Sequence, residues 1–112
     1  MITTEKGHEF DYETVDEAME ELQKITFDRM FVGSGEISRV RNLLHLQGKK
    51  PRELRAVRNA VVDRFCDLRR KQGIVTEDGY VTDYDASDRI STSISAITSV
   101  IDIEIFNQGG QP

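Results

Sequence analysis

The residue types best suited to catalysis or metal binding are scarce in this sequence. It contains one cysteine, Cys66, and two histidines, His8 and His45. A nucleophile needs a neighbouring base, and a zinc site needs clustered ligands, but neither histidine stands in an HExxH spacing or beside a cysteine pair. The sequence therefore predicts a protein that is not an enzyme and that uses no metal and no cofactor.

A second candidate for metal binding is the run DGYVTDYDASD, in which Asp83, Asp85 and Ser87 occupy alternate positions. An EF-hand loop that starts at Asp83 needs glycine at its sixth position and glutamate at its twelfth. Asp88 and Ile94 stand there instead. Helix capping by Asp85 or Ser87 explains these polar residues better than calcium binding does.

Charge is distributed in three blocks along the 112 residues, whose formal net charge is −5. Residues 1–28 hold nine acids and two bases, residues 29–71 hold twelve bases and four acids, and residues 72–112 hold seven acids and one base. The basic block can bind an external polyanion, or it can pair with the acidic blocks of the same chain. The sequence leaves both alternatives open.

Nucleic acid is one candidate ligand for the basic block, because arginine side chains match phosphate groups. Against it, the chain has no recognisable helix-turn-helix turn, and its overall acidity is unusual for a nucleic-acid-binding module. The candidate basic residues for binding a nucleic acid or another partner are Arg39, Arg41, Lys49, Lys50, Arg52, Arg55, Arg58, Arg69 and Arg70.

The first predicted helix carries a dense row of carboxylates on one side. Like charges at this density repel one another unless a cation lies near them. That cation can come from the basic block of the same chain or from a partner. The residues of this candidate acidic interaction face are Glu13, Asp16, Glu17, Glu20 and Glu21.

Hydrophobic periodicity and helix-breaking residues predict the elements that position these charges. Four helices are expected: from about Val15 to residues 27–31, from Ser34 to about Gln47, over residues 52–72 after Pro51, and from about residue 85 to 106.

Between the third and fourth helices, two β-prone runs flank Asp78-Gly79, which predicts a short β-hairpin. The last segment contains the alternating run IDIEI, so residues 100–106 are predicted as helix or as strand. The predicted fold class is mainly α, a small four-helix domain with a short β-hairpin between helices 3 and 4. We expect a single domain over residues 1–112, with flexible ends at about 1–10 and 107–112.

The fourth helix is apolar on more than one side near its C-terminal end, which predicts a homo-oligomer. The candidate oligomer-interface residues are Val100, Ile103 and Phe106. A single cysteine, no apolar run behind a basic start, and no long apolar stretch predict a soluble cytoplasmic protein without membrane contact.

Together these patterns predict a non-enzymatic protein-interaction module: an adaptor, an assembly component or an inhibitor of a larger partner, acting through charged and apolar helix faces. The expected partner is a protein of unknown identity. The alternative is a nucleic-acid-binding regulator that uses the basic third helix. A small acidic protein of this kind would be unsurprising in a phage or mobile element.

Overall fold

Four helices form most of the structure, a computed structural model that describes residues 2–3, 9–10, 12–27 and 32–109. The predicted mainly α fold with four helices is confirmed. The helices are α1 (Tyr12–Lys24), α2 (Ser34–Leu43), α3 (Pro51–Lys71) and α4 (Tyr84–Asn107).

Two short strands that the sequence did not predict lie before the first helix. Strand β1 (Ile2–Thr3) pairs antiparallel with β2 (Glu9–Phe10). The predicted flexible ends lie partly outside the described residues. Where the structure describes them, these two strands are paired and α4 continues to Asn107.

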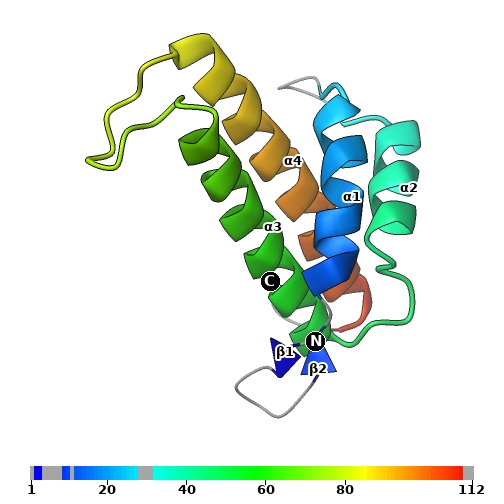
Figure 1. Ribbon diagram of the computed structural model, residues 1–112. Coiled ribbons are helices and arrows are strands. Elements are labelled where there is room, and N and C mark those ends of the chain that lie inside the picture. Colours follow the sequence, from blue (N-terminus) through cyan, green and yellow to red (C-terminus); the bar gives the residue numbers. More distant parts are fainter. Residues whose placement is uncertain (1, 4–8, 11, 28–31, 110–112) are drawn as a thin grey trace.

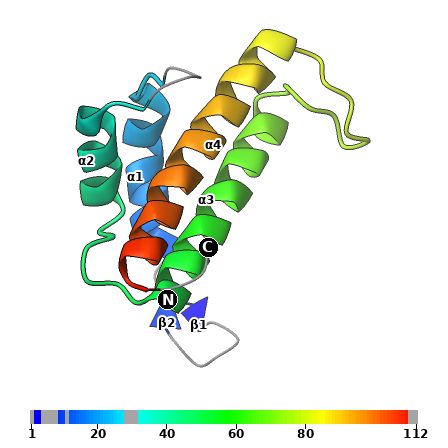
Figure 2. The ribbon, with the colours of Figure 1, turned by 180° about the vertical axis from the view of Figure 1, so that it is seen from behind.

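The two long helices, α3 and α4, lie side by side and antiparallel (Figures 1 and 2). Helix α1 packs against α3, and α2 packs against both α1 and α4. Toward their connection, α3 and α4 diverge from α1 and α2, so the connection projects away from the other helices (Figure 1).

The core forms where the apolar stripes of the four helices meet. On α3, Leu54, Val57, Val61 and Phe65 are buried, as their spacing of three or four residues predicts. The other buried core residues are Val15, Ala18, Leu22, Ile25, Val40, Leu44, Leu46, Ala60, Ile97, Val100, Ile101 and Ile105.

Helix α4 begins at Tyr84, one residue before the predicted start at about residue 85, and extends through the ambiguous segment. Asp83 is its N-cap, and the carboxylate accepts a hydrogen bond from the backbone N–H of Ala86 at 3.0 Å. Residues 100–106 are helical, because this conformation places Ile97, Ile101 and Ile105 one turn apart on the buried face. The strand alternative for this segment is therefore wrong.

The predicted β-hairpin between α3 and α4 is also wrong. All of the residues between these helices are described, and they contain only an isolated antiparallel bridge between Val75 and Val81. Asp78-Gly79 does turn the chain, with Gly79 at φ +88°. Tyr80 is exposed and no third strand covers the ribbon, so ladder formation stops at one bridge.

Candidate protein-interaction surfaces

Three of the candidate basic residues contact acidic side chains of other helices. Arg39 Nη2 lies 2.7 Å from Glu21 Oε2 of α1. Arg58 of α3 pairs with Asp102 of α4. These basic side chains therefore link helices of the same chain.

The third pair joins α2 to the buried face of α4. Arg41 Nε lies 2.5 Å from Glu104 Oε1, and the Glu104 side chain is only 7% exposed. The Arg41 N–H is not aligned with the carboxylate, so the contact is an ion pair without a well-formed hydrogen bond. Glu104 is thus a buried carboxylate whose charge Arg41 offsets.

The C-terminal half of α3 contributes two further contacts. Arg69 Nη2 donates a hydrogen bond to the Ser87 hydroxyl of α4 at 2.6 Å. Arg70 Nη1 lies 3.8 Å from Asp67 on the same helix.

At the other end of α3, the Lys50 backbone N–H donates a hydrogen bond to Glu53 at 3.2 Å. The Lys50 side chain is exposed and Lys49 is half-buried. Arg52 and Arg55 each take part in an interaction of their own. The candidate basic residues are thus spread over many intramolecular contacts.

The acidic face of α1 is partly neutralised within the chain. Arg64 of α3, which the sequence did not single out, donates a hydrogen bond to Asp16 at 2.5 Å. Lys24 lies 3.5 Å from Glu20 and 3.3 Å from Glu21. The hydrogen bonds that Glu21 accepts from Lys24 and Arg39 lower the pKa of the Glu21 carboxyl group. The hydrogen bond between Lys24 and Glu21 also raises the pKa of Lys24.

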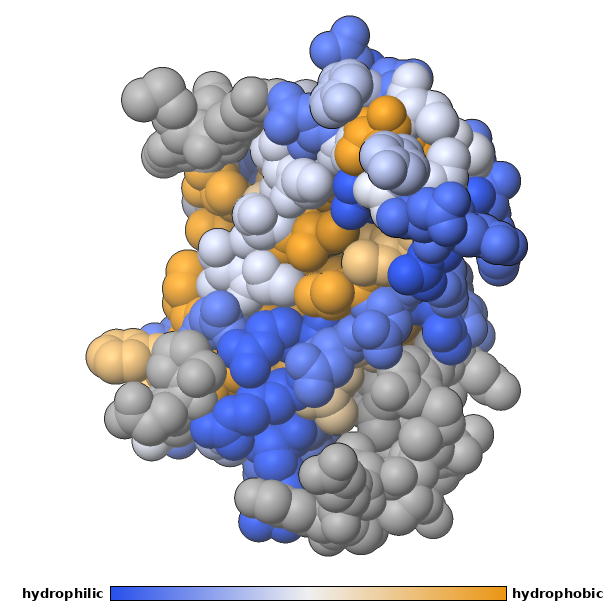
Figure 3. Space-filling view, turned by 90° about the vertical axis from the view of Figure 1, so that its left-hand side faces the viewer, coloured by the Kyte–Doolittle hydropathy of each residue, from blue (hydrophilic) through white to orange (hydrophobic). Residues whose placement is uncertain are grey.

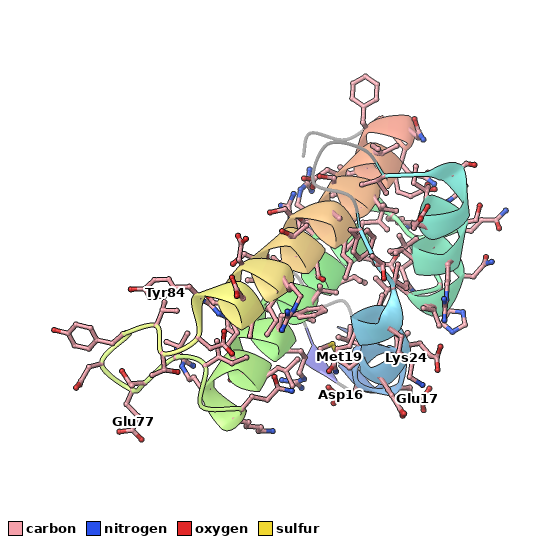
Figure 4. The ribbon with its side chains drawn as sticks, turned by 90° about the horizontal axis from the view of Figure 1, so that it is seen from above. Asp16, Glu17, Met19, Lys24, Glu77 and Tyr84 are labelled. Carbon is pink, nitrogen blue, oxygen red and sulfur yellow. The ribbon has the colours of Figure 1, made fainter. Side chains whose placement is uncertain are left out.

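The two remaining members of the predicted acidic face are Glu13 and Glu17. Glu17 is exposed on α1, where Figure 4 shows its side chain. The side chain of Glu13 lies outside the described residues.

The predicted oligomer-interface residues separate into one core residue and two surface residues. Val100 is 2% exposed and belongs to the core, so its assignment to an interface is wrong. It lies three residues after Ile97 on the face that packs against the other helices. Ile103 and Phe106 are 50% and 70% exposed.

Sequence reasoning missed the most prominent exposed aromatic residues, Tyr80 and Tyr84, which are 72% and 77% exposed. Tyr80 lies in the connection between α3 and α4, which we call the tip loop (residues 74–83). Tyr84 follows it as the first residue of α4 (Figure 4). Two tyrosines four residues apart among acidic residues were the signal in the sequence.

Hydrogen bonds hold the backbone of the tip loop. The Thr76 N–H donates to the Tyr80 carbonyl at 2.9 Å, and the Thr82 N–H donates to the Ile74 carbonyl at 2.8 Å. The Gly79 N–H closes the turn on the Thr76 carbonyl at 2.9 Å. The tip loop therefore presents its side chains from an ordered frame.

A cleft of about 320 Å³ separates the end of α1 from the diverging ends of α3 and α4. Among the described residues that line it, the one ionic side chain is Arg89, so these residues supply no carboxylate or imidazole that could act as a general acid or base. The apolar side chains that line it are Ile25, Phe27, Phe65, Leu68, Ile74 and Ile90.

The chemistry-bearing residues do not gather elsewhere in the described part of the chain. Cys66 is half-buried and His45 is exposed, whereas His8 lies outside that part. Its histidine, cysteine and carboxylate side chains form no group of three or more that could hold a metal ion. Among its helices, none has both the length and the apolar character needed to cross a membrane.

Comparisons of the chain with protein-family models, with curated proteins and with solved structures found no match.

Proposed function

We propose that this protein is a non-enzymatic protein-interaction module, acting as an adaptor, an assembly component or an inhibitor of a larger partner. The observation that carries the proposal is Tyr80, an exposed aromatic side chain on a loop whose backbone is closed by hydrogen bonds. Tyrosine supplies a large contact area at a small cost in conformational entropy and is enriched among interface hot spots. We assign the tip loop as the docking surface.

The charge of the tip loop defines the chemistry of the partner. Glu77 and Asp78 are exposed at the turn, and residues 74–83 include no basic residue. Arginine fits this surface best, because a guanidinium pairs with carboxylates and also stacks on aromatic rings. The expected partner is a protein surface that presents arginine beside apolar side chains.

The alternative function, nucleic-acid binding, has less support. Arg39, Arg41 and Arg58 contact carboxylates of α1 and α4, so binding phosphates through them would require these ion pairs to break. The tip loop is acidic and would repel a phosphate backbone. Both observations favour a protein as the partner.

The proposed location is the cytoplasm. Cys66 has no second cysteine in the sequence with which to form an intrachain disulfide. A reducing compartment suits this composition.

A peptide-display experiment tests the docking surface. A library of random 16-residue peptides is selected on the immobilised protein, and the enriched peptides are synthesised and titrated by calorimetry. We expect peptides that contain arginine and apolar residues, and we expect Tyr80→Ala to weaken their binding at least about tenfold, because interface hot spots contribute this much or more.

The matched control is Glu17→Gln, which removes an exposed carboxylate from α1 and should leave the affinity unchanged. Enriched peptides that bind the Tyr80→Ala variant as tightly as the unmodified protein would refute the assignment of the tip loop. A selection that enriches nothing would count against the interaction module itself.

A further inference from the structure

The tip loop is held to the helices by little apolar contact. Among residues 74–83, all of which the structure describes, only Ile74 is buried, and Val75 and Val81 are half-buried. Figure 3 faces the side on which the tip loop projects, and its upper part shows mostly blue and white surface with little orange. Because apolar packing secures only the start of the loop, the direction of the loop depends on polar contacts at its two ends.

Arg69 contacts the chain on both sides of the tip loop. Its backbone carbonyl accepts hydrogen bonds from the N–H groups of Ile74 at 2.9 Å and Val75 at 3.3 Å, where the loop begins. Its side chain reaches α4, where Nη2 donates a hydrogen bond to the hydroxyl group of Ser87 at 2.6 Å. Ser87 lies in the first turn of α4 and is 7% exposed. One residue of α3 therefore links the start of the loop to the helix that follows its end.

The hydrogen bond to Ser87 is the contact through which the Arg69 guanidinium acts. Arg69 is half-buried, and its Nε is buried without an acceptor among the described residues. A hydrogen bond from a charged donor is stronger than one between neutral groups, and partial burial protects it from competing water. Thr82 provides a second connection, since its N–H and its hydroxyl both donate to the Ile74 carbonyl, at 2.8 and 3.0 Å. Thr82 belongs to the loop itself, whereas Arg69 holds the two helices from which the loop departs.

We propose that Arg69 is a positioning residue for the tip loop: its hydrogen bond to Ser87 holds the start of α4 against the end of α3 and so fixes the direction in which Tyr80 is presented. This role rests on the proposed function, because the direction of Tyr80 matters only if the tip loop is the docking surface. The hydrogen bond itself belongs to the free protein, so its effect can be measured without a partner. Without this bond the two helix ends can separate, the loop adopts more orientations, and a partner has to order it on binding.

Amide hydrogen exchange of Thr82 measures how firmly the ends of the loop are held, because the Thr82 N–H is protected only while it donates to the Ile74 carbonyl. In Arg69→Met we expect this amide to exchange at least about fivefold faster, since a hydrogen bond from a charged group contributes at least this factor to the equilibrium between the held and the open loop. Methionine keeps much of the length of the side chain but has no N–H donor.

The matched control is Arg58→Met. Arg58 also links α3 to α4, through Asp102, but it lies about 16 Å along α3 from Arg69, so its loss weakens the helix pair without opening the loop. Thr82 exchange should change by less than about twofold in this variant. Equal acceleration in the two variants would show that Arg69 only adds to general stability and would overturn the proposal, as would an unchanged rate in Arg69→Met.

Ser87→Ala tests the same hydrogen bond from its other end. It removes the acceptor while leaving Arg69 in place, and alanine suits a helix at least as well as serine does. It should accelerate Thr82 exchange to within about twofold of the effect of Arg69→Met, and the double variant should be no faster than the single variants, because each loses the same bond. If Ser87→Ala had no effect, Arg69 would not act through Ser87 and the proposal would be wrong.

Peptide binding measures the consequence for a partner. For the peptides selected on the tip loop, Arg69→Met should weaken the affinity about three- to tenfold, whereas Arg58→Met should leave it unchanged. Because Tyr80 is retained, calorimetry should assign this loss to a less favourable binding entropy rather than to the enthalpy. An affinity that stays unchanged in Arg69→Met, although Thr82 exchanges faster, would overturn the positioning role.

The docking surface and the role of Arg69 can fail separately. If the peptides bound Tyr80→Ala as tightly as the unmodified protein, the tip loop would not be the docking surface, whereas faster Thr82 exchange in Arg69→Met would still show that Arg69 holds the loop. If peptide binding depended on Tyr80 but neither exchange nor affinity changed in Arg69→Met, the docking surface would stand and the positioning role of Arg69 would be refuted.

Discussion

At the scale of single residues, the arginines of this chain serve mainly to connect its helices. The pair between Arg41 and Glu104 is the most consequential, because the Glu104 side chain is buried while the Arg41 side chain is 42% exposed. A buried carboxylate without its cation is costly, whereas replacing both members of the pair by apolar residues is often neutral. The pair therefore acts mostly by neutralising a charge that the fold has buried.

Replacing the cation alone should be worse than replacing both partners. We expect Arg41→Met to lower the free energy of unfolding by about 1–3 kcal/mol, reduced from the value for a fully buried pair because Arg41 is partly exposed. The double variant Arg41→Met/Glu104→Met should lose less than Arg41→Met alone. Urea denaturation of the single and double variants measures both quantities.

The ion pair between Arg39 and Glu21, at the surface, serves as the comparison for the pair between Arg41 and Glu104. Arg39 and Glu21 are both close to half-exposed, so Arg39→Met should cost less than about 1 kcal/mol. If Arg39→Met lowered the free energy of unfolding more than Arg41→Met does, burial of the carboxylate would not explain the importance of the Arg41–Glu104 pair.

At the scale of elements, the sequence predicts a helix well where its own apolar stripe makes it necessary. The spacing of Leu54, Val57, Val61 and Phe65 on α3 leaves few alternatives, and all four residues are buried. The hairpin failed because Asp78-Gly79 specifies only a turn, whereas a sheet also needs a covered face.

Contacts between distant segments were harder to predict than the helices that make them. Arg64 pairs with Asp16, which lies 48 residues away, so its role depends on how α1 packs against α3. The exposure of a side chain also depends on how the helices pack against one another. The burial of Val100 and the exposure of Tyr80 could therefore not be predicted from the sequence. The sequence therefore predicts the charge of each candidate surface, but it does not predict which side chains lie on that surface.

Replacing glycine by alanine should change the stability of this protein in opposite directions at Gly73, which follows α3, and at Gly35, which lies in the first turn of α2. Gly73 ends α3 with φ +69°, a conformation in which a Cβ is strained, so Gly73→Ala should lower the free energy of unfolding by about 1 kcal/mol. Gly35 lies inside α2, and an added Cβ would meet nothing within 4 Å. Gly35→Ala should raise the free energy of unfolding by about 0.5–1 kcal/mol.

Thermal and urea unfolding of both variants check this pair of predictions. A stabilising Gly73→Ala would mean that the end of α3 does not need the left-handed conformation. A destabilising Gly35→Ala would argue against a helical residue at that position.

At the scale of the whole molecule, the packing explains the order of charges along the chain. The basic helix α3 lies between the acidic helix α1 and the last helix, and it contacts both. Arg64 reaches the first of these neighbours and Arg58 the second. The acid, base, acid order is therefore consistent with a chain whose charges are paired internally.

Internal pairing leads us to expect little affinity for nucleic acid. In fluorescence anisotropy at about 50 mM salt, a labelled 20-base-pair duplex and a single strand should bind no more tightly than non-specific complexes, with a Kd of about 10⁻⁴ M or weaker. Saturable binding that falls steeply with salt and is lost in Arg55→Glu/Arg58→Glu would favour the nucleic-acid alternative instead.

The position of the tip loop has a consequence for how the protein can be attached to a support or a reporter. Strands β1 and β2 lie at the opposite end of α3 from the tip loop (Figure 1). A tag fused ahead of β1 would therefore stay clear of a partner held at Tyr80, and a binding assay could immobilise the protein by that tag without blocking the tip loop.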